Sequence, residues 1–318
     1  MKPRLAAIVL SILLSLPLAA QKKAANDTLI FTPQWTAQAQ FAGYYVALEK
    51  GFYADEGIHV KLDYPNASRT ALDRIRKNES HITTLPLLQA LEAVDHGMPL
   101  VNILQTSMNS SLVIVSRRGM DPLSQKGARV ASFRAGYSQL ATAVAEEMGL
   151  EYEWLETAGL LNIFIAGAVD ASLGTSYNEY FQFLQTGLLE RNPNLVFRFR
   201  DNGYNIQEDG LYMTREEYDK NPDRALKFAR ASQRGWEWAA SNPDEALQIV
   251  MKHVRRNHLA TNPTLQQLML AETLKLMEDP ESGKREYLLR EDMFNVAVEL
   301  MFKHGITSKQ HNIKELLP

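Results

Sequence analysis

Short apolar runs alternate with longer amphipathic stretches along most of this sequence. The runs have the length and β-branched content of buried strands, and in the first part of the chain they lie at residues 29–31, 58–62, 82–85, 99–104 and 112–116. Between them, apolar side chains recur with helical period; Phe41, Tyr44 and Tyr45, for example, share one face. Helices are expected to begin near Ser68 and to cover residues 87–95. This alternation predicts a parallel-type α/β sheet.

The same layout returns further along the chain. A strand at residues 128–133, a loop at 134–138 and a helix at 139–148 repeat the order found at the start. Five further segments follow: helices at 162–166 and 177–185, and strands at 154–155, 169–173 and 195–199. We interpret this stretch as a second lobe.

The rest of the chain is mostly helical. Residues 201–210 are polar and contain glycine, so we place a return crossing to the first lobe there. Amphipathic helices are then predicted at 223–241, 244–253, 262–277 and 291–304. The prediction is therefore a first lobe built from residues 28–116 and 207–318, and a second lobe built from residues 117–206.

The first twenty residues have the pattern of a secretion signal. Lys2 and Arg4 precede the apolar run 5–18, and Ala19 and Ala20 follow it. We expect residues 1–20 to be a signal peptide and 21–27 a polar tether, with the mature protein in the periplasm. Retention of the leader as an anchor stays an alternative, because Leu18 is a mediocre residue three positions before the cut.

Composition removes several classes of function. The formal charge of −3 for 318 residues becomes about −5 without the two basic leader residues, so a nucleic-acid partner is not expected. Zero cysteines exclude disulfides, thiolate metal sites and cysteine nucleophiles. The seven histidines show no HExxH spacing, and GxSxG, P-loop and Gly-rich cofactor motifs are lacking. We predict no metal, no cofactor and no catalysis.

The loop after the first strand holds the first candidate binding residues. Trp35 and Gln38 lie where a strand passes into a helix, a place at which α/β units collect ligands. With Tyr44 or Tyr45, Trp35 could form an aromatic wall worth about 0.5–1.5 kcal/mol per well-placed stack. The alternative is that both tyrosines belong to the core of the helix.

Two further strand ends supply candidates. In the second lobe, Phe133, Gly136 and Tyr137 precede a helix whose backbone N–H groups suit an anion or a polar ligand edge. An ordinary strand-to-helix turn explains these residues equally well. Leu85, which ends a strand of the first lobe, is also included among the candidate ligand-binding residues.

Two pairs of adjacent residues, each with at least one carboxylate, complete the candidates. Asn178 and Glu179 offer an amide and a carboxylate, which can pair with the ring nitrogen and exocyclic amine of an aminopyrimidine. Helix capping with a solvated glutamate is the alternative. Glu208 and Asp209 lie at the return crossing, as part of a hinge, a rim or a solvated turn.

The segment QWTAQAQFAGYYVALEKGFY at residues 34–53, with ADEGIHV after it, resembles the opening of periplasmic solute-binding proteins of the NMT1/THI5 type. The resemblance extends over about residues 28–307. It implies a two-lobed, type II periplasmic binding protein with the ligand between the lobes. It also implies an ABC permease as partner, contact with the membrane only through that permease, and a monomer. Tyr177, Asn178 and Glu179 match a ligand-facing Tyr-Asn-Glu, and the implied ligand is a thiamin-related aminopyrimidine.

Three alternatives stay open. Some eukaryotic relatives are pyrimidine-forming enzymes that use a cysteine-rich motif, a histidine and pyridoxal phosphate, but this chain has no cysteine. The same fold also serves as the input domain of membrane receptor kinases. Within transport, sulfonate, nitrate or another small aromatic compound remains a possible ligand.

Overall fold

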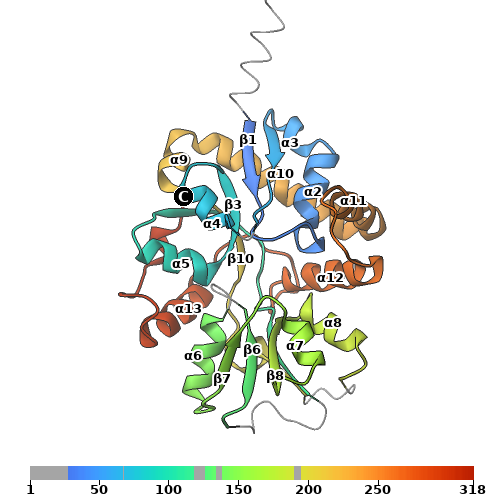
Figure 1. Ribbon diagram of the computed structural model, residues 1–318. Coiled ribbons are helices and arrows are strands. Elements are labelled where there is room, and N and C mark those ends of the chain that lie inside the picture. Colours follow the sequence, from blue (N-terminus) through green and yellow to red (C-terminus); the bar gives the residue numbers. More distant parts are fainter. Residues whose placement is uncertain (1–27, 67, 118–125, 134–137, 190–194) are drawn as a thin grey trace, which may run out of the picture.

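A computed structural model describes residues 28–66, 68–117, 126–133, 138–189 and 195–318. The expected signal peptide and tether, together with Gly136 and Tyr137, lie outside the described residues. Two α/β lobes stand one above the other in Figure 1, each built around its own five-stranded sheet. The predicted two-lobed α/β fold is confirmed.

The first sheet has the order β2-β1-β3-β10-β4. Its strands are β1 (Thr28–Thr32), β2 (His59–Leu62), β3 (Ile82–Pro86), β4 (Leu100–Gln105) and β10 (Asp209–Thr214). β1 runs parallel to β2 and β3, whereas β10 is antiparallel to both of its neighbours, β3 and β4. The expectation of a parallel-type sheet is therefore wrong for one strand in five. Sequence analysis missed β10 because its apolar run spans only residues 211–213, after a polar start.

The second sheet has the order β7-β6-β8-β5-β9 and repeats this plan. Its strands are β5 (Leu112–Ser116), β6 (Arg129–Ser132), β7 (Glu153–Glu156), β8 (Ala171–Thr175) and β9 (Val196–Arg198). β5 is antiparallel to β8 and β9, so it belongs to the second lobe. The expected end of the first lobe at residue 116 is thus too late, because the chain crosses at residues 106–111. A fully buried strand carries no sign in its sequence of the sheet it joins.

Helices cover both sheets. The second lobe carries α6 (Gln139–Glu147), α7 (Leu160–Ile165) and α8 (Glu179–Gln185). The remaining helices are α2 (Ala42–Glu49), α3 (Phe52–Asp55), α4 (Ala71–Arg76), α5 (Leu87–Asp95), α9 (Arg215–Lys220), α10 (Pro222–Ser241), α11 (Pro243–Arg256), α12 (Pro263–Leu276) and α13 (Glu291–Lys303). A 3₁₀ turn, η1 (Ala39–Phe41), precedes α2. Among the residues described, every helix is too short or too polar to cross a lipid bilayer.

Local sequence explains where the long C-terminal helices begin. α10, α11 and α12 each start with a proline, whose fixed φ and missing N–H suit the first helical position. The asparagine before α10, Asn221, accepts a hydrogen bond from the N–H of Arg224, and Asn262 does the same for Leu265. Helices predicted from the apolar period alone are therefore confirmed with close boundaries.

Two glycines let α2 and α10 pack very closely. A Cβ atom on Gly43 would lie 2.2 Å from the ring of Trp236, and one on Gly235 would lie 2.1 Å from the carbonyl oxygen of Gly43. Trp236 therefore packs directly against the backbone of α2. Tyr44 packs against it with ring centroids 5.6 Å apart, and against Phe31 at 5.0 Å.

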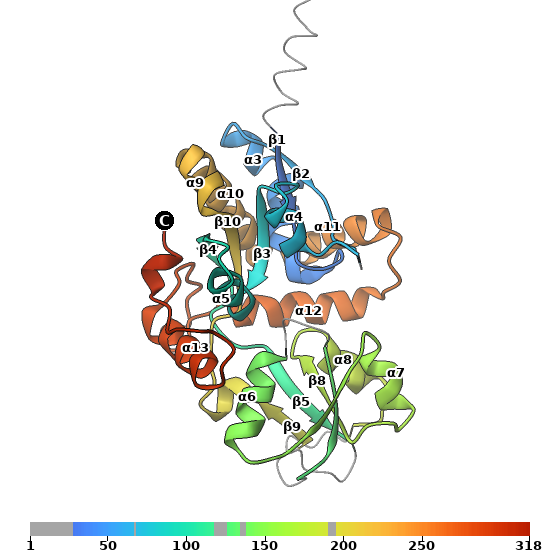
Figure 2. The same cartoon turned by 60° about the vertical axis from the view of Figure 1, so that its left-hand side comes forward.

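Elements near the C-terminus join the two lobes. Figure 2 shows α12 lying between the upper and lower lobes, and α13 beside them; α13 packs on α5 of the first lobe and α6 of the second. One hydrophobic cluster contains Leu87, Leu112, Leu140 and Phe294, which come from both lobes and from α13. Tyr177 of the second lobe is buried in the core cluster of the first. The structure therefore describes the lobes in close contact.

Candidate ligand-binding site

Segments at the ends of strands from both lobes enclose two small cavities. The segment after β1 and the one after β8 contribute to one cavity, while the end of β3 and the start of α6 contribute to the other. The crossing segment that leads into β10 contributes Glu208 to both. Ligands of α/β sheets bind at the carboxyl ends of strands, so both cavities lie where a binding site is expected.

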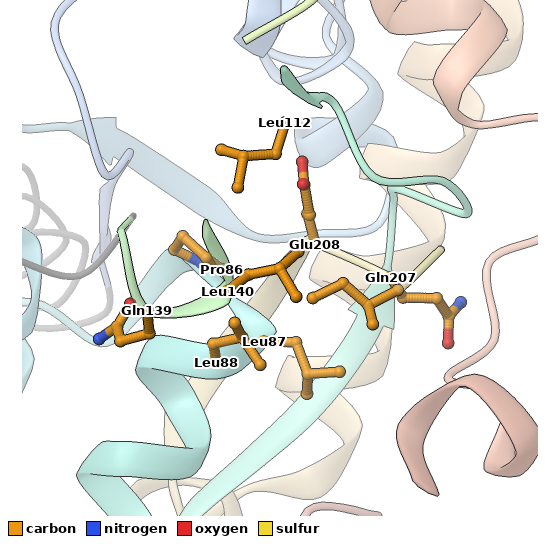
Figure 3. A pocket seen from close by; sticks show the side chains of 9 residues that line it. Pro86, Leu87, Leu88, Leu112, Gln139, Leu140, Gln207 and Glu208 are labelled. Carbon is orange, nitrogen blue, oxygen red and sulfur yellow. The ribbon is translucent and has the colours of Figure 1, made fainter. Parts of the chain in front are cut away.

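The first cavity, which we call the polar chamber, has a volume of about 20 Å³. Its walls include Gln40, Tyr177, Glu208, Asp209, Trp236 and Thr273. The second, which we call the apolar chamber, has about 30 Å³ and is lined by Pro86, Leu87, Leu88, Leu112, Leu140 and Ile206 (Figure 3). Small-molecule sites commonly measure about 300–1,000 Å³. Neither chamber, as the structure describes it, has room for a whole ligand of ordinary size.

Asp209 is held by two amides from the segment after β1. Gln34 Nε2 donates to its Oδ1 over 2.7 Å, and Gln40 Nε2 donates to its Oδ2 over 2.6 Å. Burial raises the pKa of Asp209, and the two amide donors offset only part of that rise. An acceptor with two fixed donors is positioned rigidly beside the polar chamber.

Glu208 is held by serines at residues 110 and 111, at the end of the segment by which the chain crosses from the first lobe to the second. Ser110 Oγ donates to one carboxylate oxygen over 2.7 Å and Ser111 Oγ to the other over 2.6 Å. Although part of the residue is exposed, burial of its carboxylate raises the pKa to about 7, against the lowering effect of the two serines. Glu208 and Asp209, which are neighbours in the sequence, therefore both have raised pKa values at the contact between the lobes.

Two buried polar groups of the polar chamber make no well-aligned hydrogen bond in the part of the chain that the structure describes. They are Oγ1 of Thr273 and the indole Nε1 of Trp236, whose polar neighbour is the hydroxyl of Tyr44. Buried polar groups are normally paired, and an indole N–H can only donate. The chamber therefore offers a donor as well as carboxylate acceptors. No Lys or Arg side chain lines either chamber, as far as the described residues extend.

Of the candidate residues that the structure describes, Glu208, its neighbour Asp209 and Tyr177 line the chambers. Asn178 and Glu179 instead bond to each other, with Asn178 Nδ2 donating to Glu179 Oε1 over 2.7 Å. The second oxygen of Glu179 accepts from the backbone N–H and the hydroxyl of Thr175. Both oxygens of this carboxylate are thus used within its own loop, and burial raises its pKa.

The remaining predicted residues lie elsewhere. Trp35 is 55 % exposed and lines neither chamber. Tyr44 and Leu85 are buried in the two core clusters, and Gln38 is buried with its amide bonded to Gln40. Phe133 is half-buried against the second-lobe cluster and against the cluster that both lobes share. An aromatic wall of Trp35 and Tyr44 is therefore not formed with the lobes in contact, because Tyr44 packs between Phe31 and Trp236.

Sequence reasoning also missed several lining residues. In the sequence, Trp236 looks like a core residue of an amphipathic helix. Gly43 on α2 and Gly235 on α10 let the two helices approach closely, and this places Trp236 at the chamber. Thr273 is one polar position on the apolar face of α12. Asp209 was noticed only as a neighbour of Glu208. The described residues contain no group of His, Asp and Glu side chains that could hold a metal ion.

Comparison with known proteins agrees with this architecture. The family model described as "NMT1/THI5 like" matches residues 38–246, about two thirds of the chain. The chain belongs to this family. Its fold is that of the two-lobed periplasmic binding proteins: the aliphatic sulphonate binding protein SsuA of Escherichia coli matches with a TM-score of 0.65 at 15 % identity, over 92 % of this chain and 97 % of that one.

Two relatives with similar sequence identity to this chain are named after different ligands. The riboflavin-binding protein RibY of Chloroflexus aurantiacus is 25 % identical over 83 % of this chain and 77 % of its own. A formylaminopyrimidine-binding protein of Halalkalibacterium halodurans is 23 % identical over 80 % of this chain and 79 % of its own. Each ligand name describes that relative.

Proposed function

We propose that this NMT1/THI5-like protein is an extracytoplasmic solute-binding protein that delivers a thiamin-related aminopyrimidine to an ABC importer. The observation that carries the proposal is the pair Glu208 and Asp209, which bring two carboxylates to the contact between the lobes, while no described residue on the chamber walls is basic. The named ligand of the Halalkalibacterium halodurans relative supports the choice of an aminopyrimidine.

The chemistry of the chamber matches that of the ring. An aminopyrimidine presents an exocyclic amine that donates hydrogen bonds and ring nitrogens that accept them. The carboxylate of Glu208 can accept from the amine or from a protonated ring nitrogen, and Trp236 Nε1–H can donate to the other ring nitrogen. The ring thereby supplies a well-aligned acceptor to an indole N–H whose polar neighbour among the described residues is the Tyr44 hydroxyl.

The same features argue against an anionic ligand. A sulfonate or nitrate brought beside Glu208 would meet a carboxylate and would find no cationic partner among the described wall residues, so both desolvation and repulsion would oppose binding. Protonation of Glu208 would remove the repulsion but would supply no positive charge. Anion capture therefore requires residues other than those on the chamber walls.

Riboflavin is the second candidate, because RibY is the other relative of comparable similarity. Its isoalloxazine system contains a pyrimidinedione ring, which also presents a donor between two acceptors. Melting curves of the purified chain with an aminopyrimidine, thiamin, riboflavin, ethanesulfonate and nitrate test the choice, since a ligand of the native state raises the melting temperature. A rise with the aminopyrimidine is expected, and a rise only with the anions would refute the proposal.

We assign binding without chemistry to the site. The enzymes that resemble this family use a cysteine-rich motif, and this sequence contains no cysteine. Incubation with pyridoxal phosphate and analysis for a pyrimidine product tests this point. Permease and ATPase genes beside the gene for this chain would favour transport, whereas kinase modules would favour a sensory role.

The expected path of the protein is export, release of residues 1–20 and action as a monomer in the periplasm. Asn178, Glu179 and Trp35 retain proposed roles in the separated form, where lobe movement can bring the loop after β8 and the exposed indole to an incoming ring. Closure is then a hinge motion about residues 106–111 and the segment before β10, and the ligand shifts the population toward the closed form.

A further inference from the structure

The apolar chamber differs sharply in chemistry from the polar chamber beside it. Six aliphatic or proline side chains line it, and the start of α5 and the start of α6 form its opposite walls (Figure 3). Glu208 and Gln139 supply polar side chains, whereas the amide of Gln207 points away and bonds to the backbone carbonyl of Leu288. An aminopyrimidine ring held by carboxylates leaves such a surface unused.

The two chambers are neighbours that share Glu208 as a wall residue. β1 and β3 are neighbours in the first sheet, β6 and β8 are neighbours in the second, and the polar chamber lies at the β1 and β8 side. The apolar chamber lies at the β3 and β6 side, and Glu208 forms part of both. A ligand anchored at Glu208 therefore has the apolar chamber within reach once the lobes separate.

We propose that the apolar chamber is a second subsite, which receives an apolar substituent or fused ring of the same ligand whose pyrimidine-type ring occupies the polar chamber. The inference rests on the proposed function. It narrows the ligand class to pyrimidine-type rings with an apolar extension and disfavours a bare, fully polar ring. Gln139 of the chamber wall also joins the two lobes, because its Nε2 donates to Glu92 of the first lobe over 2.8 Å.

The size of the effect follows from burial. Each methylene group removed from water contributes enough to tighten binding about fourfold. A three-carbon substituent that fills the subsite is therefore expected to tighten binding by at least about tenfold, after losses for ordering the chain. The same substituent left in water would change the affinity little.

The test uses a matched pair of probes and isothermal titration calorimetry on the full mature chain. One probe is 4-amino-2-methylpyrimidine, and the other is the same ring with a propyl group at position 5. The measured quantity is the ratio of the two dissociation constants. The wild-type chain is expected to prefer the propyl compound by at least about tenfold.

Variants of Leu140 assign the gain to this chamber. Leu140→Asn places an amide on the wall and is expected to reduce the ratio to about two or less, and the exposed Leu268→Asn on α12 is the matched control that keeps the wild-type ratio. If Leu140→Asn does not fold, Leu140→Ala replaces it, and the enlarged chamber should shift preference from propyl toward a 5-benzyl compound.

The outcomes separate two failures. If the parent ring binds and the wild-type ratio is near one, or if the Leu140 variant keeps the wild-type ratio and preference, the subsite is refuted and the proposed function stands. If neither probe binds, the aminopyrimidine function fails and the subsite fails with it.

Discussion

Ser176, which follows β8 in the second lobe, donates a hydrogen bond from its hydroxyl to Oε1 of Glu272 on α12 over 2.7 Å. Arg200 of the second lobe approaches the same carboxylate at 3.7 Å. Thr273, the next residue along α12, lines the polar chamber. A contact between the lobes is therefore adjacent in sequence to a wall of the binding site, and closing the lobes and enclosing a ligand use the same helix.

Removing this contact should weaken ligand binding although Glu272 lines neither chamber. Glu272→Ala deletes a hydrogen bond to a charged group, worth about 1.5–3 kcal/mol, and is expected to raise the dissociation constant about tenfold or more. Calorimetry measures the affinity, and small-angle X-ray scattering should show a larger radius of gyration at saturating ligand. Glu281→Ala, at an exposed position after α12, is the control. Wild-type affinity in Glu272→Ala would contradict this role.

Glu208 should make stability fall as pH rises. Its pKa is raised to about 7 in the folded protein, so the folded state binds a proton that the unfolded state releases near pH 4.3. The stabilisation is therefore complete below about pH 4 and is lost as the pH rises through 7. Relative to Glu208→Gln, the wild-type chain is expected to lose about 1–3 kcal/mol of unfolding free energy between pH 4.5 and pH 8.

Urea denaturation at both pH values measures this difference. The comparison with Glu208→Gln cancels the contributions of titrating groups that do not interact with Glu208, and the measured difference includes its coupling to Asp209. An unfolding free-energy difference that is the same at pH 4.5 and pH 8 would show that the carboxylate of Glu208 titrates normally.

Glu179→Gln should act through the loop that it organises. Its carboxylate accepts from the N–H of Thr175 over 2.9 Å and from its hydroxyl over 2.7 Å, and Tyr177 of the polar chamber lies inside this loop. We expect a loss of about 1–3 kcal/mol in unfolding free energy, together with weaker binding. The exposed Glu153→Gln in the same lobe is the control. Weaker binding with unchanged stability would instead favour direct contact between Glu179 and the ligand.

Gly43→Ala should disturb the polar chamber by displacing Trp236, which forms part of its wall. The new methyl group would lie 2.2 Å from the Trp236 ring, so α2 and α10 must separate or the indole must turn. Overpacking of this kind costs about 1–3 kcal/mol or more, and displacement of the indole should also weaken ligand binding. Gly159→Ala is the matched control, since the nearest atom to its Cβ would be a side-chain atom 3.7 Å away. Equal melting temperatures for the two variants would contradict the packing argument.

The sequence was sufficient for most elements and for the two-lobed plan, because hydrophobic period and proline or glycine boundaries act locally. It was insufficient where contacts between segments that are distant in the sequence determine whether a strand forms and which sheet it joins. The short run at Leu211 became a strand only because β3 and β4 leave a place between them, and Leu112 joined the second sheet although its sequence fits either.

The candidate site was predicted less well for a related reason. Asn178 and Glu179 carry suitable groups, but whether they face a ligand depends on the loop geometry, and here Thr175 takes the carboxylate. Trp236 has no chemical signal in the sequence that separates it from a core residue. Glu208 was a candidate because of its place at the predicted return crossing, and the structure puts it on the walls of both chambers.

The central claim is that paired carboxylates at the contact between the lobes select a donor-bearing pyrimidine over an anion. Isothermal titration of the mature chain with 4-amino-2-methylpyrimidine and, separately, with ethanesulfonate tests it most directly, with Glu208→Gln in parallel. We predict saturable binding of the pyrimidine, at least about tenfold weaker in Glu208→Gln, and no heat from the sulfonate. Saturable binding of the sulfonate with none of the pyrimidine would contradict the claim.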